Sequence, residues 1–434
     1  MCKCWEKDRE RRYHTMREVA IELETVCREC ESGTLVAPTV NRAATTIRVA
    51  ATNHSASLRS FFTSRPGLAL AALVMLVAVA SVYALFFRSS RSVPSTSVKS
   101  VNSPAYDYYL RGKVNVGSEN RENNESAIKL LEQAIAADPN FAPAYAELAR
   151  AYHIKAFYFA FDADRKKLTE DSEVALEKAL TLNPDLAEAH FVRGLLLWSH
   201  ANRFPHEQAI QSYKRALALN PNLAEAHHQL GLVYLHIGLL DKAWEEIENA
   251  LASNPGNTLA RFRFGVINLY RAKYEEALAF FNSTPLDKNP ALLSFQTATA
   301  LLQLGRTQEA SEIVEEYLNT YATDEGGTVT SVKAMLLAKA GKEREAEETI
   351  RRAVEIGKGF GHFHHTAYNI ASAYALLNKP EQAIKRLEVA AADGFPCYPL
   401  FENDANLDSL RKDERFIAFM AKLKQQWERY NATL

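Results

Sequence analysis

The sequence predicts an all-α protein in which a stack of helical hairpins follows one membrane-spanning helix. Three observations support this prediction. The 434 residues include only 15 Pro and 17 Gly, too few for a fold built on tight turns. A pattern of small and apolar residues recurs about every 34 residues in the second part of the chain. One stretch of 21 residues, Gly67 to Phe87, carries no charged side chain.

Composition and charge narrow the classes of function. With 47% hydrophobic and 24% charged residues, the chain has the make-up of an ordinary folded protein. Its formal net charge is −1, so it offers no general attraction to a polyanion. We therefore expect no nucleic-acid partner.

The first residues carry a resemblance to an enzyme family. Residues 4–26 read CWEKDRERRYHTMREVAIELETV and contain apolar side chains at helical spacing. This stretch resembles the last two helices of a protein kinase domain, in the form found in bacterial receptor-type Ser/Thr kinases. It differs at Arg9, where the family has Pro, and at Trp5, where Leu is usual. The resemblance implies that residues 1–31 are the C-terminal remnant of a kinase domain.

The motifs that kinase chemistry needs are missing from this sequence. It contains no glycine-rich loop, no strand lysine, no His-Arg-Asp loop and no Asp-Phe-Gly motif. We therefore expect no catalytic activity, no catalytic residue and no cofactor. The alternative is that the chain is a fragment of a transmembrane Ser/Thr kinase, whose repeat region regulates the kinase or recruits partners.

Four cysteines near the start have a spacing that zinc sites also use. Cys2 and Cys4 form a C-x-C pair, and Cys27 and Cys30 form a C-x2-C pair. However, Cys4 is the cysteine that the kinase resemblance already expects. We therefore interpret the four side chains as reduced thiols and expect no metal there.

A basic segment with an apolar centre predicts a membrane anchor. From Ser32 to Tyr106 the sequence has no Asp or Glu but seven Arg or Lys. As a helix, Gly67–Phe87 would be about 31 Å long, which matches the hydrocarbon layer of a bilayer. Arg65 and Arg88 bracket it and can reach the lipid headgroups. We predict a transmembrane helix at 67–87 between linkers at 32–66 and 88–103.

The orientation of this anchor rests on the resemblance, because the positive charges on its two sides do not decide it. A kinase remnant implies a cytoplasmic N-terminus and a repeat region outside the cytoplasm, with the protein in the cell (inner) membrane. The opposite orientation, with a cytoplasmic repeat region, stays open.

The repeats begin near Ala105, and the clearest unit is AEAHHQLGLVYLHIGLLDKAWEEIENALASNP, from Ala224 to Pro255. Its small, apolar and terminating residues resemble the tetratricopeptide (TPR) pattern, which implies an α-α superhelix of helical hairpins. The residues that carry this resemblance are Leu230, Gly231, Tyr234, Ala243, Ile247, Ala250 and Pro255.

The pattern has a physical reason. Gly231 and Ala243 are small where the two helices of a hairpin cross, Tyr234 and Ile247 fill the neighbouring holes, and Pro255 cannot continue the second helix. A single hairpin cannot bury its apolar face, whereas stacked copies can. Similar anchors predict about eight hairpins in a TPR domain at 104–392.

The last segment, 393–434, is predicted to cap the stack. Phe416, Met420, Leu423 and Trp427 recur at helical spacing and give one apolar face. The opposite face is polar, as the end of a repeat array requires. This ending resembles that of bacterial TPR proteins joined to kinases or cyclases.

The TPR resemblance also implies a binding groove for a protein or peptide partner on the concave face, lined by the first helix of each hairpin. The alternative is that these side chains only pack a tight superhelix, and a homo-oligomer also stays open. Transferred by register, the groove residues are Arg150, His153, Phe191, Trp198, His228, His236, Phe262, Tyr270, Phe295 and Gln303.

Three further features of the sequence bear on its possible ligands. The Lys/Asn clamp of chaperone-binding TPR domains is missing, which disfavours capture of an acidic C-terminal tail. His362, His364 and His365 could bind a transition metal, but no carboxylate pattern supports it, so we expect a structural role. The FYFAF run, Phe157 to Phe161, is either an aromatic plug or a partner surface, and we favour packing.

Overall fold

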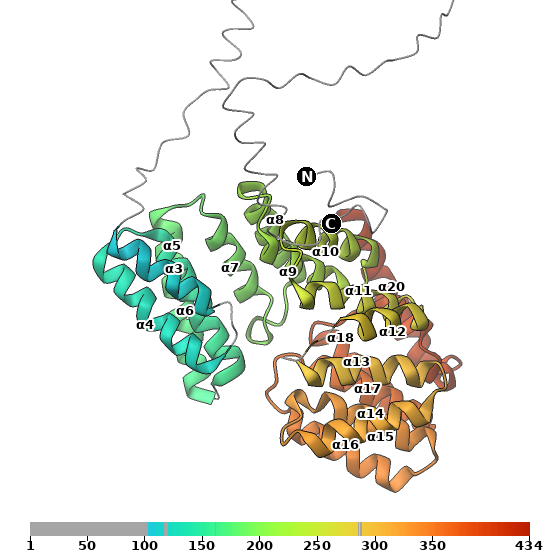
Figure 1. Ribbon diagram of the computed structural model, residues 1–434. Coiled ribbons are helices and arrows are strands. Elements are labelled where there is room, and N and C mark those ends of the chain that lie inside the picture. Colours follow the sequence, from blue (N-terminus) through green and yellow to red (C-terminus); the bar gives the residue numbers. More distant parts are fainter. Residues whose placement is uncertain (1–102, 117–119, 161, 285, 287–288) are drawn as a thin grey trace, which may run out of the picture. The chain divides into compact units, whose positions relative to one another are not determined.

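The computed structural model describes residues 103–434 except 117–119, 161, 285 and 287–288 (Figure 1). The predicted kinase remnant (1–31), the linkers up to residue 102 and the predicted span at 67–87 lie outside the described residues. Within the described residues every regular element is helical, and none of these helices is both long enough and apolar enough to cross a bilayer. The described residues belong to one compact unit.

Sixteen of the described helices form eight hairpins of consecutive helices. The first four hairpins are α3 (Pro104–Val116) with α4 (Arg121–Ala137), α5 (Ala142–Ile154) with α6 (Asp162–Leu182), α7 (Ala187–Leu197) with α8 (His206–Leu219), and α9 (Ala224–His236) with α10 (Leu240–Ser253). The last four are α11 (Thr258–Tyr270) with α12 (Tyr274–Ser283), α13 (Pro290–Gln303) with α14 (Thr307–Thr320), α15 (Thr328–Lys339) with α16 (Glu343–Gly357), and α17 (Phe363–Leu376) with α18 (Pro380–Ala392).

Each hairpin packs on the next, as Figure 1 shows from α3 to α18. First helices contact each other directly, for example α5 with α7 and α15 with α17. Second helices contact the first helix of the following hairpin. This arrangement is the TPR-like all-α superhelix that the sequence predicts.

Small residues allow the close crossing within a hairpin. A Cβ atom on Gly231 would lie 3.0 Å from Ile247 Cδ1 and 3.3 Å from the Ala243 carbonyl oxygen. Ala243 and Ile247 are themselves buried. The crossing that the sequence predicts in the fourth hairpin is thus confirmed, and larger side chains there would push the helices apart.

The turns within the hairpins are also regular. In the fourth to eighth hairpins, a residue with positive φ follows the first helix and reverses the chain. Glycine holds this position in three turns, and Ala or Asn holds it in two. The residues are Gly238, Ala272, Gly305, Gly341 and Asn378.

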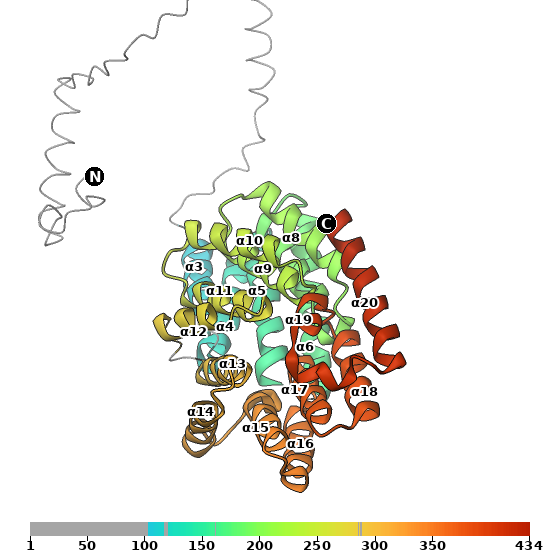
Figure 2. The ribbon, with the colours of Figure 1, turned by 90° about the vertical axis from the view of Figure 1, so that its right-hand side faces the viewer.

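After α18, the chain forms α19 (Tyr398–Asn403), the 3-10 helix η6 (Ala405–Leu410) and α20 (Glu414–Thr433). The predicted apolar stripe on α20 is largely buried. Figure 2 shows α20 beside α18 and α19, which it contacts. It also reaches the middle of the stack, because Trp427 Nε1 donates a hydrogen bond to the Gly238 carbonyl oxygen at 2.9 Å. The capping segment therefore joins the last hairpin to the third and fourth hairpins.

Candidate functional site

The inner face of the stack is formed by the first helices, and all ten predicted groove residues lie on them or at their ends. None of the ten is fully exposed. Seven are buried: Phe191, Trp198, His228, His236, Phe262, Tyr270 and Phe295. The other three, Arg150, His153 and Gln303, are half-buried.

Much of this face is covered by the chain's own C-terminal part. We define the covering segment as residues 358–365, between α16 and the start of α17, together with residues 393–404. The Trp198 ring lies 5.9 Å from the His362 ring, and the Tyr270 ring lies 5.7 Å from the Phe395 ring. These contacts join positions more than a hundred residues apart in sequence.

One side chain of the aromatic run after α5, that of Phe157, packs against the covering segment, and Phe161 lies outside the described residues. Residues Lys155–Phe159 form a single turn of π-helix, η3. From it the Phe157 ring contacts the rings of Phe360 and His362. Nearby, Arg165 Nη1 donates a hydrogen bond of 2.7 Å to the Gly359 carbonyl oxygen. Phe157 thus packs against the covering segment, whereas Tyr158 stays exposed.

Asp404 anchors the covering segment by accepting hydrogen bonds from two first helices. Its Oδ1 accepts from Gln303 Nε2 at 2.7 Å, and its Oδ2 accepts from the Tyr368 hydroxyl at 2.6 Å. The carboxylate also accepts from the main-chain N–H of Asn406 at 2.8 Å. A cavity of about 30 Å³ between Asp404, Phe295 and His365 is large enough for one water molecule.

Three other predicted groove residues pack inside the stack. Phe262 is wholly buried and packs on Phe281 of its own hairpin, with ring centroids 4.8 Å apart. His228 is buried close to Arg263, and His153 contacts Phe157. In this conformation these side chains pack the superhelix, which is the alternative that the sequence left open.

The first three hairpins differ, because their inner face keeps charged groups that are partly exposed. Lys113 Nζ of α3 lies 3.8 Å from Glu147 of α5 and 3.7 Å from Glu188 of α7. Arg150 lies 3.6 Å from Glu147 and stacks over the Phe191 ring at 5.5 Å. Burial raises the pKa of the Glu147 carboxyl, and the neighbouring Arg150 and Lys113 oppose that rise. One oxygen of Glu147, Oε2, has no hydrogen-bond partner.

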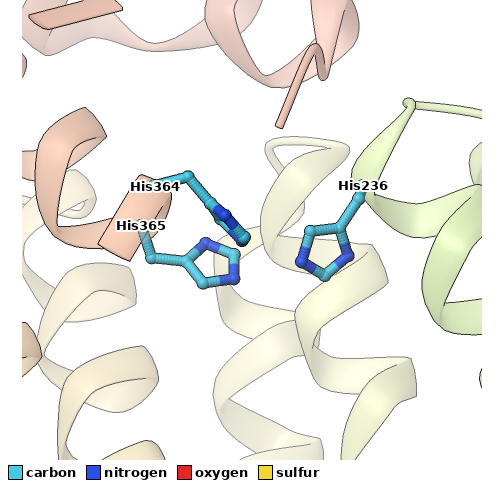
Figure 3. Close-up of side chains that lie close together, drawn as sticks. All are labelled: His236, His364 and His365. Atoms are coloured by element: carbon cyan, nitrogen blue, oxygen red, sulfur yellow. The ribbon is translucent and has the colours of Figure 1, made fainter. Parts of the chain in front are cut away.

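A second feature of the inner face is a group of histidines from distant helices. His236 ends α9, and His364 and His365 begin α17 (Figure 3). One ring nitrogen from each of these three residues lies within 4.8 Å of the others. The sequence pointed to His362, His364 and His365 as a group, but nothing in it places His236 beside them.

The hydrogen bonds of this cluster are incomplete. His236 Nδ1 donates to the Leu232 carbonyl oxygen at 2.8 Å, while its Nε2 has no partner. His364 Nδ1 is also buried without a hydrogen bond, 3.8 Å from Asp393 Oδ2. A buried polar atom that lacks a partner costs about 1–3 kcal/mol. Two of the buried side-chain atoms without a hydrogen bond in the described residues thus lie in this one cluster.

Burial also sets the charge of the cluster. It is the main cause that lowers the pKa of His236, His364 and His365 well below 6.5, and neighbouring histidines add to the effect. The three imidazoles are therefore neutral near pH 7.

A cavity of about 660 Å³ lies where α20 meets the start of α8 and the end of α18. Its lining combines aromatic side chains such as Phe204 and Phe419 with the charged Arg203, Glu207 and Lys422. This cavity lies along the contact between the capping helix α20 and the third hairpin.

The stacked hairpins, with their first helices along the inner face, define an α-solenoid repeat protein. Residues 206–238 match the family model described as "TPR repeat", and residues 224–257 match the one described as "Tetratricopeptide repeat". These residues form α8, α9 and α10, and the hairpins on either side repeat their geometry. Residues 206–257 therefore carry TPR repeats, and the described part of the chain has a TPR-like helical fold.

Solved TPR structures are similar to this chain over part of its length. A tetratricopeptide repeat protein from Parabacteroides merdae is 18% identical with a TM-score of 0.42, covering 64% of this chain and 98% of its own. TTC0263 from Thermus thermophilus is 26% identical with a TM-score of 0.32, covering 45% and 95%. YrrB, described as a TPR protein with an unusual peptide-binding site, is 22% identical with a TM-score of 0.27, covering 42% and 86%. No curated protein matches the chain significantly.

Proposed function

We propose that this chain is a membrane-anchored scaffold that binds a protein or peptide on its first three hairpins and has no catalytic activity of its own. The observation that carries the proposal is the row of partly exposed charges on α3, α5 and α7. Their side chains remain accessible, with 34% of Lys113 and 23% of Glu188 exposed. The later part of the inner face is filled by the covering segment.

The charges favour a basic partner. Three carboxylates, those of Glu147, Glu188 and Glu225, interact here with two cations, Lys113 and Arg150, which leaves an excess of one negative charge. Of these carboxylates, that of Glu147 is buried with its Oε2 3.6 Å from Arg150, whereas that of Glu188 is 23% exposed. A partner segment that brings an Arg or Lys to this row would pair with the accessible Glu188 carboxylate.

Affinity capture tests the binding site. The full-length chain, solubilised from its own membranes, should retain a discrete partner, and Glu188→Lys should abolish the retention by repelling the basic segment. Glu173→Lys on α6 makes the same change of charge on an exposed position of a second helix and should leave capture intact. Equal retention of the same partner by both variants would reject this surface, provided that both keep the helical circular dichroism signal.

The anchor is tested separately. The uncharged stretch 67–87 supports a membrane span, and the kinase-like residues before it support a cytoplasmic N-terminus with the TPR domain outside the cytoplasm. The full chain should stay in the membrane pellet after a carbonate wash, and deletion of 67–87 should release it. Protease added to intact spheroplasts should digest the TPR domain. A full-length chain found in the carbonate supernatant would disprove the anchor.

A second function is favoured by residues 4–26, which resemble the end of a kinase domain. In this alternative the TPR region regulates a longer Ser/Thr kinase or recruits partners to it. An in-frame Asp-Phe-Gly motif encoded upstream of Met1 would support the kinase, and a stop codon with a ribosome-binding site would support the scaffold.

A further inference from the structure

We propose that His236, His364 and His365 form a binding site for one divalent transition-metal ion, with zinc as the best match, and that the ion fastens α9 to α17. The three residues come from two helices that are distant in sequence, and their ring nitrogens already converge within 4.8 Å (Figure 3).

The geometry is close to that of a zinc site. Zinc–nitrogen bonds of about 2.0–2.1 Å place tetrahedral ligand atoms about 3.3 Å apart. The spacing in the cluster is wider, so rotation of the side chains by roughly 1 Å at the ring nitrogens would complete the geometry. Three protein ligands leave a fourth position that a water molecule would occupy.

The surroundings of His236 match those of a metal ligand. A histidine that binds a metal usually donates its other N–H to a carbonyl or carboxylate, which fixes the tautomer. His236 Nδ1 donates to the Leu232 carbonyl oxygen, so its lone pair lies on Nε2, the atom that has no partner. His362 lies next to the cluster, with its Nδ1 3.4 Å from His364 Nε2.

The chemistry of the donors selects the ion. Imidazole nitrogens without thiolate or carboxylate ligands suit zinc, copper or nickel and not calcium or magnesium. The three rings are neutral near pH 7, which is the form that binds metal. The Arg263 guanidinium opposes a cation, since its charge lowers the pKa of His236 and His365, and the Asp393 carboxylate beside His364 offsets it.

Zinc titration of the full-length chain tests the proposal. Cys2, Cys4, Cys27 and Cys30 are first replaced by Ser, because they could bind zinc themselves. This background should bind one zinc ion per chain and melt at a higher temperature with zinc than with a chelator. His236→Gln and His365→Gln should each weaken binding at least about tenfold. His190→Gln, on α7 and away from the cluster, should have no effect.

Cobalt gives a second readout that does not depend on the variants. Co²⁺ added to the same background should produce the visible absorption of a four-coordinate site with nitrogen ligands. Absence of zinc binding and of this spectrum would overturn the proposal. Unchanged zinc affinity in a His236→Gln/His365→Gln double variant that keeps its helical signal would do so as well.

Discussion

Gly194 shows how much a single small residue contributes to this fold. A Cβ atom at this position would lie 2.4 Å from Cε1 of Tyr213, on the partner helix of the same hairpin. The Tyr213 ring is itself completely buried and cannot move into solvent. The third hairpin can therefore close only if residue 194 has no side chain.

We predict that Gly194→Ala lowers the free energy of unfolding by about 1–3 kcal/mol, because the added methyl group overpacks the crossing. Gly256→Ala is the matched control, since its nearest contact would be 3.7 Å away, and it should change stability by less than about 0.5 kcal/mol. Urea denaturation measures both. Equal effects would show that the helices do not cross as described.

Buried histidines make stability depend on pH. Burial lowers the pKa of His228 to about 3, helped by the Arg263 charge, and it lowers the pKa of His206 to about 4. In the unfolded chain both titrate near 6.5. His206 Nδ1 also accepts a hydrogen bond from Trp198 Nε1 at 3.0 Å, which a protonated ring could not do.

The sign of this pH dependence follows from the linkage between proton binding and folding. Above pH 6.5 both states are neutral and the full stability is present; as the pH falls below 6.5, the unfolded chain takes up protons first and stability is lost. Each of these histidines should cost about 2 kcal/mol between pH 6.5 and pH 5. Urea titrations at several pH values check this, and His228→Gln should reduce the slope. A slope unchanged by that variant would mean that His228 is not buried.

Among the elements, η6 and the residue before it hold the C-terminal segment against the stack. Asp404 caps η6 and accepts hydrogen bonds from α13 and α17, through Gln303 and Tyr368. Because Asp404 is buried, loss of its carboxylate would leave both donors without a partner.

We expect Asp404→Ala to destabilise the protein by about 2–5 kcal/mol, and to loosen the covering segment before the hairpins themselves unfold. Hydrogen exchange should report faster exchange in residues 393–410. Asp408→Ala, an exposed carboxylate in the same 3-10 helix, should change little. Unaltered protection in the Asp404 variant would contradict the role given to this residue.

Local patterns were enough to predict the elements. The spacing of small residues such as Gly231 and Ala243 marks helix crossings, and a proline such as Pro255 marks the end of a helix, so the hairpins could be read from the sequence. The contacts that α20 makes with the middle of the stack could not be predicted in this way. Its apolar stripe predicts a buried face, but nothing local shows that Trp427 will meet the turn at Gly238.

For the molecule as a whole, the sequence identified the residues of the inner face but not their surroundings. Register places Trp198, His236 and Tyr270 on that face, as the structure has them. Their coverage by residues 358–365 and 393–404 depends on the curvature of the whole stack, which adds up small rotations between hairpins. The place of His236 in the histidine cluster escaped prediction for the same reason, because His236 lies 128 residues before His364.

The central claim is that the C-terminal helix closes the TPR stack onto its own third hairpin. Arg429 of α20 pairs there with Glu207 of α8. Cysteines at these two positions, in a chain whose N-terminal cysteines are replaced by serine, should be joined within one chain by a short bismaleimide. We predict a high yield in buffer and almost none in urea. A native yield no higher than that in urea would show that the stack is open and would contradict the claim.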